Sequence, residues 1–504
     1  MPGSAPGEEP PPLAAGERER LLQPGRNCWR IERAHRFAPI VDAADYFAVL
    51  KAAILEARHT VMLISWDFDT RILLEPDDPK SGVPNKLGAF ISEVVKRRPK
   101  LCAYVLKWDF SIVQSLGRGA TPLFILDWIT DRRIRFKLDS EHPLGACHHQ
   151  KVVVIDDALA FCGGIDMTVG RWDTRGHLDD DRRRRSPWHR SLGPWHDITT
   201  AVDGAAAKAL GELARERWHR ATGERLEPPP PEHDPWPTRL DPMLRDIDVA
   251  IARTAPAHGG RPEIREIEAL YLTGIAAARR TIYLESQYFA SRRIAEALAA
   301  RLREVNGPEI VIVNPESAAG WLEEEAMGSA RARLIAELRK ADRHDRFRIY
   351  TPVTAGGTPI YVHAKVMAVD NRLLRVGSSN LNNRSMGFDT ECDIAIEAVP
   401  GTPDETRIGT AIAAVRNGLV AEHLGVTPDE VAAAHAETGS FIRAIETLRR
   451  PGRTLVPFEA ELPNEAETFI AEHELLDPER PQGLWTALTR RVWRGGSALR
   501  PATR

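Results

Sequence analysis

Residues 149–166 read HQKVVVIDDALAFCGGID, and residues 363–380 read HAKVMAVDNRLLRVGSSN. In both segments one residue separates His from Lys, four separate Lys from Asp, and six separate that Asp from Gly. The apolar runs VVVI and VMAV predict two buried strands that hold the preceding His and Lys rigidly. A pattern of this length that occurs twice at matched spacing indicates an internal duplication.

The duplication extends well beyond these two segments. An apolar period typical of a helix, followed by a strand-like run, occurs at 42–68 and again at 266–289. Further strand-like segments match in the same order, and these are 100–106 with 309–313, 132–138 with 345–350, and 196–202 with 392–399. Two copies of an α/β unit of about 190 residues explain these ordered matches better than one large domain.

The composition of the remaining segments predicts where the two units begin and end. The Pro-, Gly- and Glu-rich start of the chain predicts a disordered tail, and a proline-dense stretch predicts a linker between the units. We expect a disordered tail at 1–26, a first α/β domain at 27–224, a linker at 225–245, a second α/β domain at 246–425, and an extension at 426–504.

Charge and cysteine content restrict the class of protein. The chain has 504 residues, of which 43% are hydrophobic and 28% charged, as in a soluble globular protein. Its net charge of −3 gives no global positive field, so we expect no nucleic-acid partner. The five scattered cysteines argue against a disulfide framework or a zinc site and fit a reducing compartment. They are Cys28, Cys102, Cys147, Cys162 and Cys392.

Neither a secretory signal nor a membrane span is predicted. The first residues lack a cationic start followed by an apolar run, and the chain contains no stretch of about 18 apolar residues. We therefore expect a cytoplasmic monomer. If its substrate is a lipid, the protein reaches it from the aqueous side, through transient contact with a membrane surface.

The repeated His-x-Lys pairs point to phosphoryl chemistry. Alternate residues of a strand share a face, so His149 projects together with Lys151, and His363 together with Lys365. Two lysines neutralise a phosphoryl group, while one imidazole attacks phosphorus and the other, protonated, donates to the leaving oxygen. The intermediate is then a phosphohistidine. The lysines would repel a divalent metal, so the predicted chemistry needs no metal and no other cofactor.

The remaining motif residues have different predicted roles. Asp156 and Asp370 fall on the opposite parity or beyond the strand end, which predicts that they brace the following turn. The Gly-Gly-x-Asp and Gly-Ser-x-Asn segments, which begin at Gly163 and Gly377, allow close backbone approach and supply polar groups near the same strand ends.

These segments closely resemble the two HKD motifs of the phospholipase D superfamily, especially those of eukaryotic-type and related bacterial phospholipases D. The resemblance spans roughly residues 27–425. It implies two α/β sandwich domains, each a mixed sheet flanked by helices, related by pseudo-twofold symmetry with both motifs at one cleft. The family's usual assignment makes His149 the nucleophile and His363 the general acid and base, although the sequence does not show which attacks first.

The resemblance also assigns roles to other residues. It includes Asp156 and Asp370 among the catalytic residues of the motif, whereas strand parity predicts that they brace the following turn. The residues implied to contact substrate are Lys151, Lys365, Gly163, Asp166, Ser378 and Asn380. In the first motif Gly164 and Asp166 replace the commoner Ser and Asn. We expect Glu391 to orient a histidine, with Asp197 as its counterpart in the first half.

Aromatic residues gather near the motif ends. They are Trp66, Trp172, Trp195, Tyr288 and Tyr361. Their rings are compatible with a cage for a choline headgroup, with Trp172 as a candidate substrate contact, or with ordinary core packing. The charged run at 179–185 is more typical of a solvated loop than of a lipid site.

These features lead to one functional prediction with three alternatives. We expect hydrolysis of glycerophospholipids to phosphatidate and a free headgroup, with water or an alcohol as acceptor and transphosphatidylation when the acceptor is an alcohol. The alternatives are a phosphatidyltransferase of the cardiolipin synthase type, a nuclease of the same superfamily, and an inactive lipid-binding protein.

Overall fold

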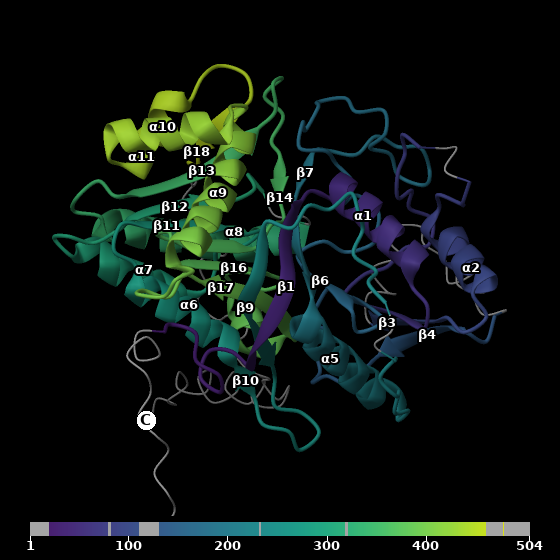
Figure 1. Cartoon of the computed structure of the whole chain (residues 1–504). Helices are drawn as coiled ribbons and strands as arrows, with labels where there is room; N and C mark the ends of the chain where they lie inside the picture. Colours follow the sequence, from purple (N-terminus) through teal and green to yellow (C-terminus); the bar gives the residue numbers. More distant parts are fainter. Residues whose placement is uncertain are drawn as a thin grey trace, which may run out of the picture.

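The computed structural model describes residues 20–78, 82–109, 131–230, 233–317, 321–459 and 477. Within them one mixed sheet of 16 strands runs through the molecule (Figure 1). The first repeat contributes β1 (Arg30–Val41), β2 (Thr60–Ser65), β3 (Cys102–Trp108), β4 (Ile134–Asp139), β5 (Val152–Ile155), β6 (Leu159–Gly163) and β8 (Ile198–Asp203). The second repeat contributes β9 (Leu244–Ala255), β11 (Thr281–Glu285), β12 (Glu309–Val313), β13 (Phe347–Val353), β15 (Val366–Val369), β16 (Leu373–Gly377) and β17 (Glu391–Glu397).

The strand order is the same in both repeats. It runs β1-β8-β6-β5-β2-β3-β4 in the first and β9-β17-β16-β15-β11-β12-β13 in the second. β1 and β9 pair antiparallel in the middle, which joins the repeats into one continuous sheet. Short β10 (Ile264–Arg265) pairs with β9, and β18 (Thr454–Pro457) pairs with β13 at the outer edge. The predicted α/β duplication is confirmed, whereas the division into two domains stays a prediction.

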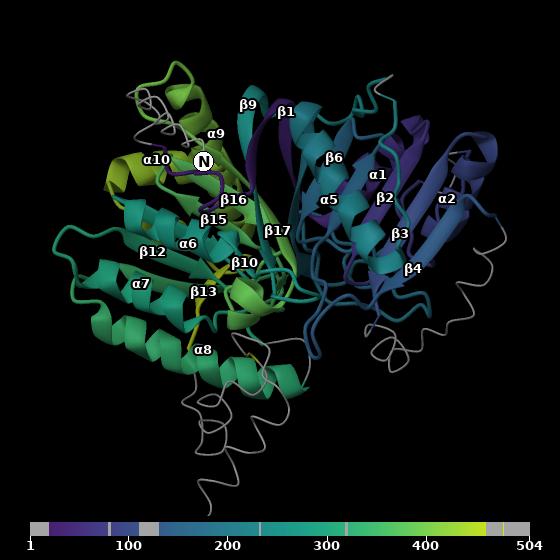
Figure 2. The same cartoon turned by 90° about the horizontal axis from the view of Figure 1, so that it is seen from below.

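Helices cover both faces of this sheet. They are α1 (Ala43–Glu56), α2 (Leu87–Arg97), α5 (Gly204–Thr222), α6 (Glu266–Ala277), α7 (Arg292–Arg303), α8 (Trp321–Ala341), α9 (Glu405–Leu424), α10 (Pro428–Thr438) and α11 (Phe441–Leu448). The core under α5, α9, α10 and α11 is shared by both repeats. On the other face α1 and α2 cover the first repeat, and α6, α7 and α8 the second (Figure 2).

Two parts of the sequence-based description need correction. Residues 20–26 are not disordered: Leu22 is buried, and its N–H donates to Glu397 at 3.1 Å. Residues 1–19 of the predicted tail lie outside the described residues. The segment with His149 and Lys151 is not part of a strand, because β5 begins only at Val152. It instead pairs with the second repeat, as the bridge between His148 and Thr390 shows.

Candidate active site

Each motif histidine is hydrogen-bonded to a carboxylate of the other repeat. His149 Nδ1 lies 3.0 Å from both oxygens of Glu391, the first residue of β17. His363 Nδ1 lies 2.6 Å from Asp197 Oδ2, just before β8. Both acids were expected, but their crossed pairing was not. It means that neither half can form a complete site alone.

Backbone hydrogen bonds hold the crossed pairs in place. The N–H of His149 donates to the carbonyl of Thr390 at 2.9 Å, and the N–H of His363 donates to the carbonyl of His196 at 2.8 Å. In the second case β14 (Tyr361–Val362) and β7 (Trp195–His196) also pair in parallel, outside the main sheet (Figure 1). Each histidine segment is thereby tied to the segment that carries its acid, which brings the two motifs together.

The lysines lie beside these histidines. Lys151 Nζ donates to the carbonyl of His149 at 2.8 Å and forms an ion pair with Asp166 at 3.2 Å. Lys365 Nζ donates to the carbonyl of His363 and is fully buried. Asp166 was expected to bind phosphate oxygens. Because a carboxylate repels phosphate, its ion pair assigns it to holding Lys151 instead.

Burial and the lysine charges set the protonation of the site. They lower the pKa of both His149 and His363 well below the usual range, with burial as the larger cause. Because the Lys365 charge acts on both rings, the two motifs lie within electrostatic reach of each other. In the free protein both rings are therefore neutral, so Nδ1–H can donate to the carboxylate while Nε2 keeps its lone pair.

Burial also shifts the pKa of the neighbouring groups. It raises the pKa of Asp197 to about 6 and that of Glu391 to about 7. It lowers the pKa of Lys365 to about 7. Groups poised near neutrality in one buried site are typical of acid–base chemistry. An anion bound between the lysines would favour their charged forms and return a proton to one histidine.

The two acids are supported differently. Ser378 Oγ donates to Glu391 Oε2 at 2.5 Å, and Ser385 Oγ donates to Oε1 at 2.7 Å. Ser378 therefore positions Glu391, whereas the resemblance implied that Ser378 contacts the substrate phosphate. In the first repeat Gly164 takes the equivalent place, and a Cβ there would lie 2.1 Å from Asp197 Oδ1. Only glycine leaves room for that carboxylate.

Asp156 and Asp370, which the resemblance counts with the catalytic motif, contact backbone N–H groups and neither motif histidine. Both lie past the far ends of their strands, β5 and β15, in left-handed conformations with φ of 51° and 52°. Asp156 accepts the N–H groups of three consecutive residues, 58–60, at 2.6 to 2.8 Å. Asp370 does the same for residues 279–281 at 2.8 to 2.9 Å. They brace the chain before β2 and β11, as strand parity predicted.

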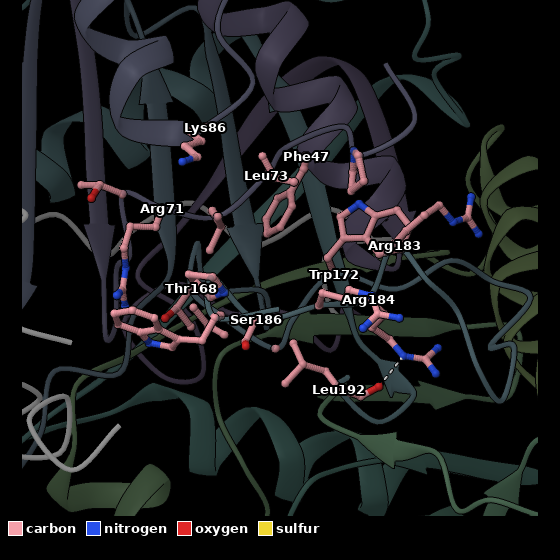
Figure 3. A pocket seen from close by; sticks show the side chains of 18 of the residues that line it. Phe47, Arg71, Leu73, Lys86, Thr168, Trp172, Arg183, Arg184, Ser186 and Leu192 are labelled. Carbon is pink, nitrogen blue, oxygen red and sulfur yellow. Dashed lines mark hydrogen bonds between the residues drawn. The ribbon is translucent and has the colours of Figure 1, made fainter. Parts of the chain in front are cut away.

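Two expected substrate contacts lie elsewhere. Gly163 allows β6 and β8 to approach, since a Cβ there would be 2.3 Å from Thr199 Cα. Trp172 lines a cavity of about 800 Å³ in the first repeat, under the cation of Arg183 (Figure 3). Neither motif histidine lines that cavity. Asn380 is buried and remains a candidate phosphate contact only through its amide Nδ2, which can donate to a phosphate oxygen, whereas its Oδ1 can only accept.

Other aromatic rings do lie at the histidines. The ring of Trp66 is 6.2 Å from that of His149, and the ring of Trp195 is 5.1 Å from that of His363. Tyr361 stacks on Trp195 at 4.5 Å. Arg171, which the sequence analysis missed, lies over Trp195 and lowers the pKa of His363 further. Arg171 lies in the segment Gly170–Asp173 (GRWD) just after the first motif, and that position was the signal that could have identified it.

Comparisons with known proteins agree with this geometry. The family described as "Cardiolipin synthase, PLD-like domain" matches residues 271–403. Phospholipase D alpha 4 of Arabidopsis thaliana is 23% identical over 82% of this chain and 68% of its own length. Phospholipase D A of Dictyostelium discoideum is 25% identical over 70% of this chain and 32% of its own length. Cardiolipin synthase A of Proteus mirabilis is 24% identical over 56% of this chain and 50% of its own length.

A solved structure shares the fold. The phosphatidylserine synthase of Haemophilus influenzae superposes with a TM-score of 0.55 at 12% identity and covers 86% of this chain and all of its own. The chain is thus a duplicated α/β protein whose two His–Lys pairs lie within electrostatic reach of each other. With the sequence matches, these features show that it belongs to the phospholipase D superfamily. It spans about a third to two thirds of the length of its curated relatives.

Proposed function

We propose that the protein is a phospholipase D-type phosphodiesterase that hydrolyses glycerophospholipids to phosphatidate and a free headgroup. The observation that carries the proposal is the crossed pairing of His149 with Glu391 and of His363 with Asp197. Two oriented imidazoles beside two lysines supply a nucleophile, a proton donor and positive charge for one phosphodiester. The phospholipases D among the relatives support the substrate class.

The first step of the proposed reaction forms a phosphohistidine. His149 Nε2 attacks phosphorus, a P–N bond forms, and the P–O bond to the headgroup breaks. The headgroup oxygen takes its proton from His363. The negative charge of the substrate, together with Asp197, stabilises the protonated ring that this step requires. Lys151 and Lys365 neutralise the phosphoryl oxygens.

The second step releases the phosphatidyl group. An acceptor oxygen attacks phosphorus while its proton passes to His363, and the P–N electrons return to His149 Nε2. Water as acceptor gives phosphatidate, whereas an alcohol gives a new phosphatidyl ester. The order of the two histidines follows the family's usual assignment and is part of the proposal.

The test uses phosphatidylcholine with a small amount of ethanol. We expect phosphatidylethanol as well as phosphatidate and choline, and we expect His149→Ala and His363→Ala each to abolish all three. Full activity in either variant would refute the two-histidine mechanism. Cleavage of single-stranded DNA without any lipid product would instead favour a nuclease.

A phosphatidyltransferase of the cardiolipin synthase type is the second candidate. The family match over residues 271–403 and the relative from Proteus mirabilis favour it. With phosphatidylglycerol as the only lipid, a transferase would join two molecules and release glycerol, whereas a hydrolase would release phosphatidate. The ratio of cardiolipin to phosphatidate therefore distinguishes the two activities.

Transient contact with a membrane surface is also part of the proposal. Among the described residues no helix has the length and apolar character that crossing a bilayer requires. Leu73 and Trp188, 43% and 58% exposed, line the cavity in Figure 3 together with several basic side chains. We expect Trp188→Ala to weaken sedimentation with anionic vesicles and to leave turnover of a soluble short-chain substrate unchanged. Unchanged sedimentation would contradict this docking surface.

A further inference from the structure

A cluster of buried histidines and carboxylates lies directly behind Asp197. The cluster consists of Asp42, His177, His196 and Glu422. One ligand atom of each residue lies within 4.8 Å of those of the other three. The first three come from the first repeat and Glu422 comes from α9 of the second. Their side chains are at most 1% exposed.

The distances within the cluster suit a tetrahedral ion. Glu422 Oε1 lies 3.1 Å from His177 Nε2 and 2.9 Å from His196 Nδ1. Asp42 Oδ2 lies 3.4 Å from His177 Nε2, and its Oδ1 lies 3.2 Å from His196 Nδ1. Bonds of about 2.0–2.1 Å to a tetrahedral Zn²⁺ separate neighbouring ligand atoms by roughly 3.3 Å.

Two atoms of the cluster lack the hydrogen bonds that buried polar groups normally make. Asp42 Oδ2 and His196 Nδ1 have no hydrogen-bond partner among the described residues. His196 Nδ1 has carboxylate oxygens at 2.9 and 3.2 Å. With the ring proton on Nε2, this nitrogen and both oxygens are acceptors, so no hydrogen bond forms between them. An ion between the four groups would satisfy both atoms.

The outer nitrogen of each histidine is held by a further carboxylate. His177 Nδ1 lies 2.9 Å from Asp173 Oδ2, and His196 Nε2 lies 3.0 Å from Glu285 Oε2. Histidines that bind a metal usually donate their other ring N–H to a carboxylate, which fixes the tautomer. Here that tautomer leaves a lone pair on the inner nitrogen of each ring; His196 Nδ1 has no hydrogen-bond partner among the described residues, and His177 Nε2 lies 3.1 Å from Glu422 Oε1.

The charges permit either one divalent ion or two extra protons. Two arginines, Arg175 and Arg184, pair with Glu422 and Asp173 at 2.6 and 2.9 Å. Of the four carboxylates, this leaves two that are not paired with an arginine, Asp42 and Glu285; His423 Nε2 lies 3.0 Å from Glu285 Oε1, and the Arg453 charge also acts on Asp42. Two protonated histidines would balance them, but each inner N–H would then need an aligned acceptor. His196 Nδ1 has none, which favours the ion.

We propose that Asp42, His177, His196 and Glu422 bind one structural Zn²⁺ ion that links the two repeats behind the active site. Asp42 Oδ1 also accepts the N–H of Asp197 at 3.1 Å, so the ion would hold the acid that orients His363. In this proposal the ion acts on His363 only through Asp197 and takes no part in bond breaking. The inference does not depend on the identity of the substrate.

Metal analysis tests the proposal directly. The full chain, without a histidine tag, is expressed with zinc in the medium, dialysed against EDTA and analysed for metals. We expect about one zinc per chain, retained because the site is closed, and released when guanidinium unfolds the protein. Glu422→Gln and His177→Gln should each retain less than about 0.2 zinc per chain. His35→Gln, a surface control whose side chain is 70% exposed, should keep one.

A second readout covers variants that fold poorly. Wild-type protein refolded with Co²⁺ should show the visible absorption of tetrahedral cobalt, and Glu422→Gln with an unchanged circular dichroism spectrum should lack it. Folded wild type with less than about 0.1 metal per chain, both after expression with zinc and after refolding with Zn²⁺ or Co²⁺, would overturn the site. Stoichiometric binding of another metal at these residues would support the site and overturn zinc.

Discussion

One added methyl group at Gly164 should disable the histidine of the opposite repeat. A Cβ at this position would lie 2.1 Å from Asp197 Oδ1, whereas ordinary contact begins at 3.4 Å. The carboxylate must therefore move by about 1.3 Å, which breaks its 2.6 Å hydrogen bond to His363. A misplacement of about 1 Å costs about 10²-fold, and loss of a carboxylate that sets a histidine tautomer costs up to about 10⁴-fold. We expect Gly164→Ala to lower kcat within that range.

The assay is the initial rate of phosphatidylethanol formation, with circular dichroism to show that the variant folds. Gly193→Ala is the matched control, because a Cβ at Gly193 meets no atom within 4 Å. Asp197→Asn should lose activity to a similar extent. Activity of Gly164→Ala within about threefold of wild type would show that the position of Asp197 does not control His363.

Three further predictions concern stability, pH and the second acid. Asp156→Ala should cost about 3 kcal/mol of unfolding free energy in urea, because three part-buried N–H groups lose their acceptor, while kcat/KM of the folded enzyme stays within about threefold. The pH profile of kcat/KM should peak near 7. It should fall below about 7, where first Glu391 and then Asp197 gain a proton, and above about 7, where Lys365 loses its charge; a profile flat from 5 to 9 would contradict this. Ser378→Ala should lower kcat about tenfold through Glu391, and an unchanged rate would argue against that support.

Local patterns predicted those features that depend on neighbouring residues alone. The apolar period before residue 60 predicted α1 and β2, and the matching period after 265 predicted α6 and β11. Spacing within the motif selected His149 over His148, which the structure pairs with Asp139 at 3.0 Å. Strand parity predicted that Asp156 lies away from the site. Only the resemblance to the phospholipase D superfamily counted it as catalytic.

Features that depend on contacts between repeats could not be predicted in this way. Glu391 was identified from its place after the second motif, but only the meeting of the two halves shows that it serves His149. His177 and His196 have no ligand spacing in the sequence, because their partners Asp42 and Glu422 come from distant segments. The scattered cysteines argued against a zinc site, but the ligands proposed here are histidines and carboxylates, on which cysteine spacing gives no information.

Covalent trapping tests the central claim, which is that two histidines act on one phosphorus atom. His149→Ala and His363→Ala are each mixed with a short-chain phosphatidyl ester of p-nitrophenol, whose leaving oxygen needs no proton from His363, and are then quenched and mapped by mass spectrometry. If His149 attacks first, the His363→Ala variant should carry one phosphatidyl group on His149, and the other variant should carry none. An adduct on neither protein, or steady turnover by either one, would contradict the account.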